Sequence, residues 1–313
     1  MRIVYFGWDE FAVPSLRKLA DSDHEVVAVV TRLHELNRND LLSKSPVPIQ
    51  AKKHNLPVFV YENPSTPELI EKLKDLKADL SIVASGQELS EPLRNAFTGG
   101  CIGIHPSLLP KYRGPSPIAW AILQGEKKTG VTVFRITDQP YAGPVLVQRE
   151  TMIPPDEIWF ELHYRLARVA CDAIDAALKI LSQDLQYVGV PQDESMATWA
   201  PELEQADCFV RFDEAALIIA SKCRASWPWS RAFSKYVNKK GEAENLKILR
   251  AKAGPSNTQA PPGTVTSELK IATADGELEI QQLVLSDGRV IAWQDFVKQR
   301  QISPGERFES IAE

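Results

Sequence analysis

The chain has 313 residues, a length that indicates two domains. Its composition, 44% hydrophobic and 25% charged, is typical of a soluble globular protein. The net charge of −5 argues against a broad nucleic-acid-binding face. The opening MRIVYFG lacks the features of a signal peptide and no apolar run is long enough for a membrane helix, so we expect a cytoplasmic protein without a membrane partner.

The first part of the chain alternates predicted strands and helices. Strands are expected at 2–6, 24–31, 56–60 and 78–84, with helices at 10–20, 46–54 and 67–76 between them. The strand at 24–31 is almost continuously apolar, which is typical of a parallel strand covered on both faces. The pattern therefore predicts an α/β fold with a doubly wound, mostly parallel sheet. It contains no G-x-G-x-x-G motif after the first strand, so a dinucleotide is not indicated.

The stretch Cys101–Gly114 combines a short apolar strand with a loop. The strand is expected to end at His105, because Pro106 keeps that histidine out of helical geometry. Ligand sites in open α/β sheets form where the strands end, so the imidazole is a candidate for proton transfer. A core histidine bonded to backbone fits the spacing equally well.

Two turns are expected beside this loop. Ser85–Leu89 follows the fourth strand, and strands at 130–137 and 145–150 bracket the turn Asp138–Gly143. Both turns are candidates for the walls of a cleft around His105. A long amphipathic helix is predicted at 157–181.

The composition changes near residue 182. A polar stretch is expected to be a linker over residues 185–203, which gives a first domain at 1–184 and a second at 204–313. The second begins with a helix at 212–225 and continues as short strands at 247–251, 263–266, 270–273, 278–285 and 289–291. Five strands of this size predict a small β-barrel of the OB-like kind.

The cysteines form no pattern of their own. Cys101, Cys171, Cys208 and Cys223 are widely separated and contain no C-x-x-C pair, which indicates neither a zinc site nor a disulfide framework. We therefore expect buried thiols and no metal.

The segment IHPSLLPKYRGPSPIAWAILQGEKKTGVTVFRIT, residues 104–137, resembles the signature of the folate-dependent formyltransferases. The opening FG..EFAVPSL, the strand HEVVAVVT and the later ISPGERF resemble the members of that family that act on initiator tRNA. The resemblance covers essentially the whole chain.

This resemblance implies transfer of a formyl group from 10-formyltetrahydrofolate to the α-amine of initiator methionyl-tRNA. His105 corresponds to the family's catalytic histidine. The resemblance also implies that the folate-contacting residues are Ser107, Leu108, Leu109 and Pro110 in the loop, with Gly86, Gln87 and Leu89 in the preceding turn. We expect the protein to be a monomer.

Two positions depart from the family pattern. The family has an asparagine two residues before the histidine and an aspartate in the later turn, where this chain has Gly103 and Tyr141. Loss of an oxyanion donor costs roughly 2.7 to 4 kcal/mol in other enzymes. One hypothesis is that the phenol of Tyr141 points into the space above Gly103 and donates to the oxyanion, while Asp138 orients water or His105. The alternative is that Tyr141 packs over an inactive cleft.

The predicted loop Arg32–Ser45 also departs from the family, whose corresponding loop is glycine-rich and strongly basic. Fewer basic residues release fewer counterions, so RNA binding through this loop is expected to be weak. Lys111 and Arg113 are candidates for phosphate contacts, although solvated surface cations are the commoner explanation.

Three functions remain open from the sequence. The first is formyl transfer to methionyl-tRNA with an altered set of catalytic side chains. The second is formyl transfer to another amine, such as a nucleotide-linked amino sugar. The third is a non-catalytic relative that binds folate or RNA.

Overall fold

The computed structural model describes residues 1–31, 46–84, 89–227 and 232–311. Its contacts divide the chain into two compact units, one of residues 1–117, 128–152 and 163–201 and the other of residues 118–127, 153–162 and 202–313. By its contacts, the stretch that precedes residue 202 belongs to the first unit. The limits 1–184, 185–203 and 204–313 stay a prediction.

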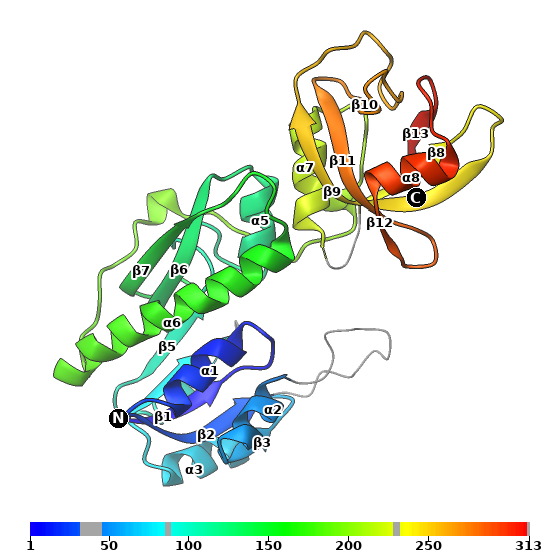
Figure 1. The fold of residues 1–313 in the computed structure, drawn as a ribbon. Helices are drawn as coiled ribbons and strands as arrows, with labels where there is room; N and C mark the ends of the chain where they lie inside the picture. Colours follow the sequence, from blue (N-terminus) through cyan, green and yellow to red (C-terminus); the bar gives the residue numbers. More distant parts are fainter. Residues whose placement is uncertain (32–45, 85–88, 228–231, 312–313) are drawn as a thin grey trace. The chain divides into compact units, whose positions relative to one another are not determined.

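The first unit contains a seven-stranded sheet among the described residues, in the order β3-β2-β1-β4-β5-β6-β7 (Figure 1). Strands β1 to β5 pair in parallel, whereas β6 and β7 are antiparallel. The predicted doubly wound, mostly parallel sheet is therefore confirmed. The strands are β1 (Arg2–Phe6), β2 (Glu25–Thr31), β3 (Val58–Val60), β4 (Leu80–Val83), β5 (Cys101–His105), β6 (Lys128–Arg135) and β7 (Val145–Met152).

Helix α3 (Pro67–Asp75) buries an apolar stripe. In α3, Leu69, Ile70 and Leu73 recur at helical spacing, and all three are buried in the core of the sheet. A proline at the first position of α3 fits a helix start, where its missing N–H has no helical partner to lose. The helices are α1 (Ala12–Ala20), α2 (Pro46–Lys53), α3 (Pro67–Asp75), α4 (Glu91–Arg94), α5 (Pro117–Leu123) and α6 (Trp159–Gln183).

The second unit contains an antiparallel sheet that closes on itself. Among the described residues its order is β10-β11-β9-β8-β13, with β12 paired to β11. Residues 264–265 connect the two edge strands of this sheet, because Thr264 pairs with Arg307 in β13 and Val265 pairs with Ile271 in β10. The predicted small barrel is therefore confirmed. Strands β8 and β13 and helix α8 were not predicted. The elements are α7 (Ala216–Ala225), β8 (Phe233–Val237), β9 (Ala243–Gly254), β10 (Ile271–Ala272), β11 (Glu277–Val284), β12 (Val290–Ala292), α8 (Trp293–Arg300) and β13 (Arg307–Ser310).

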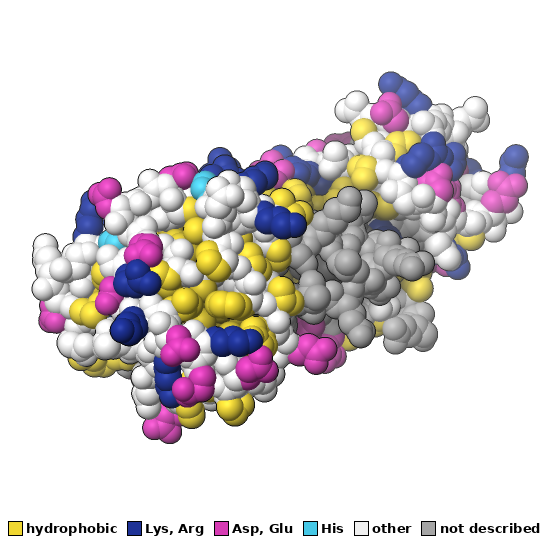
Figure 2. Space-filling view, turned by 90° about the horizontal axis from the view of Figure 1, so that it is seen from below, with side chains coloured by type: hydrophobic (Ala, Val, Ile, Leu, Met, Phe, Trp, Pro, Cys, Tyr) yellow, Lys and Arg dark blue, Asp and Glu magenta, His cyan; other side chains and the backbone are white. Residues whose placement is uncertain are grey.

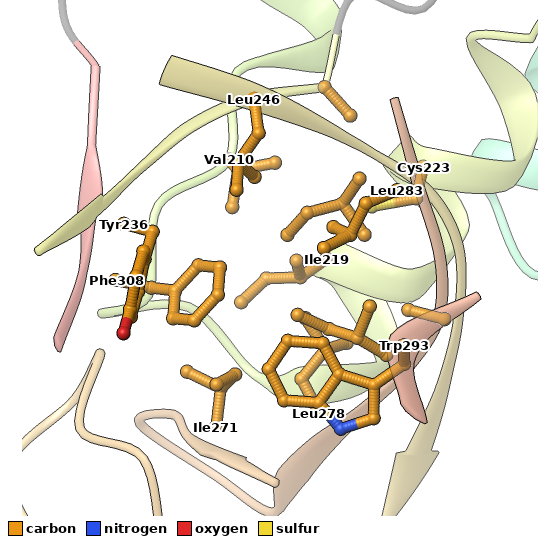
Figure 3. Packing of buried hydrophobic residues seen from close by; sticks show 14 of the residues in the cluster. Val210, Ile219, Cys223, Tyr236, Leu246, Ile271, Leu278, Leu283, Trp293 and Phe308 are labelled. Carbon is orange, nitrogen blue, oxygen red and sulfur yellow. The ribbon is translucent and has the colours of Figure 1, made fainter. Parts of the chain in front are cut away.

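The barrel is filled by apolar side chains that point toward one another from α7 and the surrounding strands (Figure 3). Tyr236 and Phe308 lie with ring centroids 5.5 Å apart, and Trp293 lies 5.8 Å from Phe308. The hydroxyl of Tyr236 donates to Glu306 at 2.7 Å, which satisfies the one polar atom of this ring. The second unit therefore has a core of its own.

The face drawn in Figure 2 carries Lys and Arg interspersed with Asp and Glu around a group of hydrophobic side chains, without a broad patch of one sign. None of the helices in the described ranges is both long and apolar enough to cross a membrane.

Candidate active site

His105 is the last residue of β5, at the carboxyl end of a strand between β4 and β6. Its neighbours across the sheet are fixed by register: His105 lies opposite Thr132 and Gly103 lies opposite Phe134. Because side chains alternate along a strand, Gly103 and His105 face the same side of the sheet. The two positions singled out from the sequence therefore belong to one surface.

The loop that follows β5 is held by internal hydrogen bonds. The hydroxyl of Ser107 donates to the carbonyl of Lys111 at 2.7 Å. The hydroxyl of Thr132 donates to the carbonyl of Ser107 at 2.7 Å and accepts from the N–H of Leu109 at 3.1 Å. The amide of Gln148 donates to the carbonyl of Leu109 at 2.7 Å. These bonds fix the backbone of the loop that directly follows His105.

The imidazole of His105 is buried, with 4% of the residue exposed, and one ring nitrogen is occupied. Its Nε2 lies 2.8 Å from the carbonyl of Tyr112, an acceptor, so this nitrogen carries the proton and Nδ1 carries the lone pair. Burial lowers the pKa of His105 to about 4, partly opposed by the bond to Tyr112. At neutral pH the ring is therefore an uncharged proton acceptor.

A cavity of about 120 Å³ opens beside this ring. Five of the predicted site residues line it: Leu89, Gly103, His105, Asp138 and Tyr141. Gln139 and Pro140 also line it, as expected for the turn Asp138–Gly143. The remaining lining residues were not predicted, and they are Val83, Arg94, Ile104, Phe134, Ile136 and Thr137. Of the predicted folate contacts, Ser107, Leu108, Leu109 and Pro110 do not line this cavity, and Gly86 and Gln87 lie outside the described residues.

The space above Gly103 is filled by Phe134. A Cβ atom at position 103 would lie 2.6 Å from Cε1 and 2.8 Å from Cζ of the Phe134 ring, closer than side chains approach in proteins. Because Phe134 occupies this space, the hypothesis that Tyr141 fills it is wrong. The corner of the cavity where the family has an amide is apolar in this chain.

The ring of Tyr141 lies against that of His105. The two ring centroids are 5.0 Å apart at 54°, and the indole of Trp199 lies 5.8 Å beyond Tyr141. The backbone of Tyr141 has φ of 60°, a left-handed conformation that is uncommon for a bulky residue. Asp138 is exposed at the rim, and within the described residues no hydrogen bond joins it to His105.

The stretch Gln192–Ala200, which we refer to as the strap, ties the loop after β5 to the turn that carries Tyr141. Gln192 accepts from Arg113 Nη2 at 2.7 Å through its oxygen and donates to the carbonyls of Tyr141, at 2.8 Å, and Gly143, at 2.7 Å, through its nitrogen. Arg113 also binds both carboxylate oxygens of Glu194, at 2.7 and 2.8 Å. The predicted phosphate contact by Arg113 is therefore wrong, because its guanidinium is buried and paired with the strap.

The predicted loop Arg32–Ser45 lies outside the described residues. Within the described ranges, no group of three or more His, Cys, Asp or Glu side chains is placed to hold a metal ion. The four cysteines are unpaired by disulfides, and Cys101, Cys208 and Cys223 are buried.

Comparison with known proteins gives one family over nearly the whole chain. The sequence pattern described as "Formyl transferase" matches residues 1–178, and that described as "Formyl transferase, C-terminal domain" matches residues 202–301. The chain is 36% identical over 309 residues to methionyl-tRNA formyltransferase of Hydrogenovibrio crunogenus, with 97% of each chain covered. It is 34% identical over 311 residues to methionyl-tRNA formyltransferase of Geotalea uraniireducens, again with 97% of each covered.

Two solved structures share the fold. HypX from Aquifex aeolicus in complex with tetrahydrofolic acid has a TM-score of 0.61 at 19% identity, over 96% of this chain and 47% of that one, so this chain spans about half of HypX. WlaRD, a sugar 3N-formyl transferase, has a TM-score of 0.62 at 16% identity, over 90% of this chain and 97% of that one. At these identities the two structures support the arrangement of elements alone.

Proposed function

The chain belongs to the formyl transferase family, and from this premise we propose that it transfers a formyl group from 10-formyltetrahydrofolate to the α-amine of methionyl-tRNA. The observation that carries the proposal is the position of His105, a neutral proton acceptor on the wall of a cavity at the end of a parallel strand. The relatives named methionyl-tRNA formyltransferase support the choice of acceptor.

The cavity has a lining that suits a pterin. Val83, Leu89 and Ile104 supply apolar walls for a flat heteroaromatic ring, and Arg94 and the backbone of the turn at 137–141 supply polar groups. The expected folate contacts at Ser107–Pro110 would lie outside this cavity, and those at Gly86 and Gln87 stay predictions from the resemblance. When bound in the cavity, 10-formyltetrahydrofolate supplies an electrophilic formyl carbon.

His105 manages the proton of this reaction. Attack by the amine forms a C–N bond and turns the formyl oxygen into an oxyanion and the amine into an ammonium. The lone pair on Nδ1 of His105 takes one ammonium proton, and the ring returns it to the folate nitrogen as the old C–N bond breaks. The bond from Nε2 to the carbonyl of Tyr112 holds the tautomer that this step needs.

The site lacks the family's amide side chain, which would donate a hydrogen bond to the oxyanion. Position 103 offers no side chain and Phe134 covers it, so the phenol of Tyr141 is the donor that we assign to the developing charge. Asp138, at the rim, is assigned to ordering solvent near the amine.

The same apolar corner favours a second candidate, a protein that binds folate without turning it over. A site that lacks the family's amide donor and its carboxylate keeps its binding walls while losing on the order of a hundredfold or more in rate.

One experiment separates the two candidates. The protein is incubated with 10-formyltetrahydrofolate and methionyl-tRNA, and formyl-methionyl-tRNA is measured beside folate binding by calorimetry. Formylation at a rate that scales with enzyme supports the first proposal. Folate binding with no product supports the second, and absence of both contradicts the assignment of the cavity.

A further inference from the structure

Trp199 is a large aromatic side chain that stays exposed beside the site. The exposed fraction of Trp199 is 55%. Its backbone is nevertheless fixed, because the residues before and after it are both hydrogen-bonded to Arg113. The N–H of Arg113 donates to the carbonyl of Thr198 at 2.9 Å, and the N–H of Ala200 donates to the carbonyl of Arg113 at 2.6 Å. The indole is therefore exposed on fixed backbone.

Gly114 allows the strap to approach this closely. It has φ of 113°, and a Cβ atom there would lie 2.5 Å from the carbonyl oxygen of Ala200 and 3.2 Å from Cε2 of Trp199. The indole thus packs against backbone that a side chain would displace. An aromatic surface that is positioned before a ligand arrives loses little conformational freedom on binding.

His105, Tyr141 and Trp199 form a row of rings from the interior to the surface. The ring contacts are 5.0 Å between the first two and 5.8 Å between the last two, and exposure rises from 4% at His105 to 55% at Trp199. Gln192 holds the middle of the row, because its side-chain amide donates to the carbonyl of Tyr141 at 2.8 Å. The outer ring is two contacts away from the proposed proton acceptor.

We propose that Trp199 is the stacking surface for the base of the nucleotide that carries the acceptor amine. The inference rests on the proposed function, because it takes the amine to reach His105. In an aminoacyl ester, one amino acid and one ribose separate the amine from the base. An amine at His105 therefore brings the base near the surface, where every base offers a flat π-face to an exposed indole.

The first test needs no turnover. The protein is labelled with fluorotryptophan, and the fluorine NMR signal of Trp199 is identified by its absence from the Trp199→Phe variant. Adenosine monophosphate and thymidine diphosphate are then titrated separately. A saturable shift of this signal with adenosine is the expected result. A shift with thymidine alone also supports stacking but identifies a nucleotide-linked sugar as the acceptor.

The second test uses the reaction itself. Trp199→Ala is expected to raise KM for methionyl-tRNA by roughly 5- to 150-fold, the range that loss of one base stack gives, and to leave KM for the folate unchanged. Trp199→Phe restores most of the affinity, because it keeps an aromatic face. Val190→Ala is the matched control, since Val190 lies close to the strap in the chain and is 63% exposed.

The outcomes decide the two proposals separately. If the parent protein forms no product, the proposed function fails, and the NMR titration still decides whether Trp199 binds a base. If neither nucleotide moves the Trp199 signal and Trp199→Ala leaves KM for methionyl-tRNA within twofold of the parent value, the stacking site is overturned.

Discussion

Two neighbouring positions on the same face of β5 have opposite surroundings. Both positions line the cavity. His105 presents a ring whose Nε2 is bonded to the carbonyl of Tyr112, whereas the ring of Phe134 fills the space that a side chain at Gly103 would take. In the proposed function, the first position supplies the proton acceptor and the second supplies no donor. Two positions on one strand face, two residues apart, can therefore differ in what they offer a ligand, because the neighbouring strand packs closely against only one of them.

The largest expected effect is loss of the proton acceptor. His105→Ala is expected to lower kcat for formyl transfer by about 10²- to 10⁴-fold, because general acid–base catalysis contributes that much, while folate affinity stays within a few-fold. Steady-state kinetics and calorimetry on the same preparation check both. His163→Ala is the control, since His163 is also a buried histidine with its pKa lowered to about 4 but does not line the cavity. Equal losses in the two variants would contradict a chemical role for His105.

Replacement of the phenol sharpens the other half of the comparison. Tyr141→Phe keeps the ring that contacts His105 and removes the hydroxyl. We expect kcat to fall by roughly 10²- to 10³-fold if the phenol donates to the oxyanion, as for other oxyanion donors. Single-turnover formylation measures the chemical step directly. Unchanged turnover would reject the donor role and leave Tyr141 as packing.

The buried imidazoles predict a pH dependence of stability. The pKa of His105 and that of His163 are each lowered from 6.5 to about 4 in the folded protein, so between these values the unfolded chain binds more protons. Stability therefore falls as pH drops from about 6.5 to 4, by about 3 kcal/mol for each ring. Urea unfolding across this range, for the parent and for His163→Leu, isolates one ring. In His163→Leu, the fall in the free energy of unfolding between pH 6.5 and 4 should be smaller than in the parent by about the contribution of one ring. The same fall in both proteins would contradict a lowered pKa for His163.

The strap gives the smallest effect. Gln192→Ala removes the bonds to the carbonyls of Tyr141 and Gly143 and the acceptor for Arg113, which we expect to lower the free energy of unfolding by about 1–3 kcal/mol. Gln186→Ala is the control, because the amide of Gln186 makes one side-chain bond, to Thr98, in an exposed setting. Denaturant unfolding compares them. A Gln192→Ala variant as stable as the control would mean that the strap does not hold the turn.

The sequence predicts what depends on local pattern. The apolar run that ends at His105 and the strand-helix alternation before it were sufficient for the sheet and for the position of the histidine. The contact between Gly103 and Phe134 depends on the register between β5 and β6, which no local pattern fixes.

The strap and the left-handed backbone of Tyr141 were also missed for physical reasons. Residues 185–203 are polar, and their bonds run to segments distant in the sequence, so they look like a linker. Tyrosine rarely adopts positive φ, and nothing in its neighbours indicated that conformation. In the barrel, β8 (Phe233–Val237) buries Ser234 and Tyr236 on one face, so its sequence FSKYV lacks the apolar and polar alternation that would predict a strand.

The close packing of Phe134 over Gly103 is tested most directly by a double-mutant cycle that measures the free energy of unfolding. Gly103→Ala is expected to cost about 1–3 kcal/mol in the parent, because the new Cβ meets the Phe134 ring. In a Phe134→Ala background the same change should cost nothing or stabilise, giving a coupling free energy of similar size. An Ile136→Ala background, where the nearest atom lies at 3.3 Å, should leave most of the cost in place. Equal costs of Gly103→Ala in the parent and in the Phe134→Ala background would contradict the account.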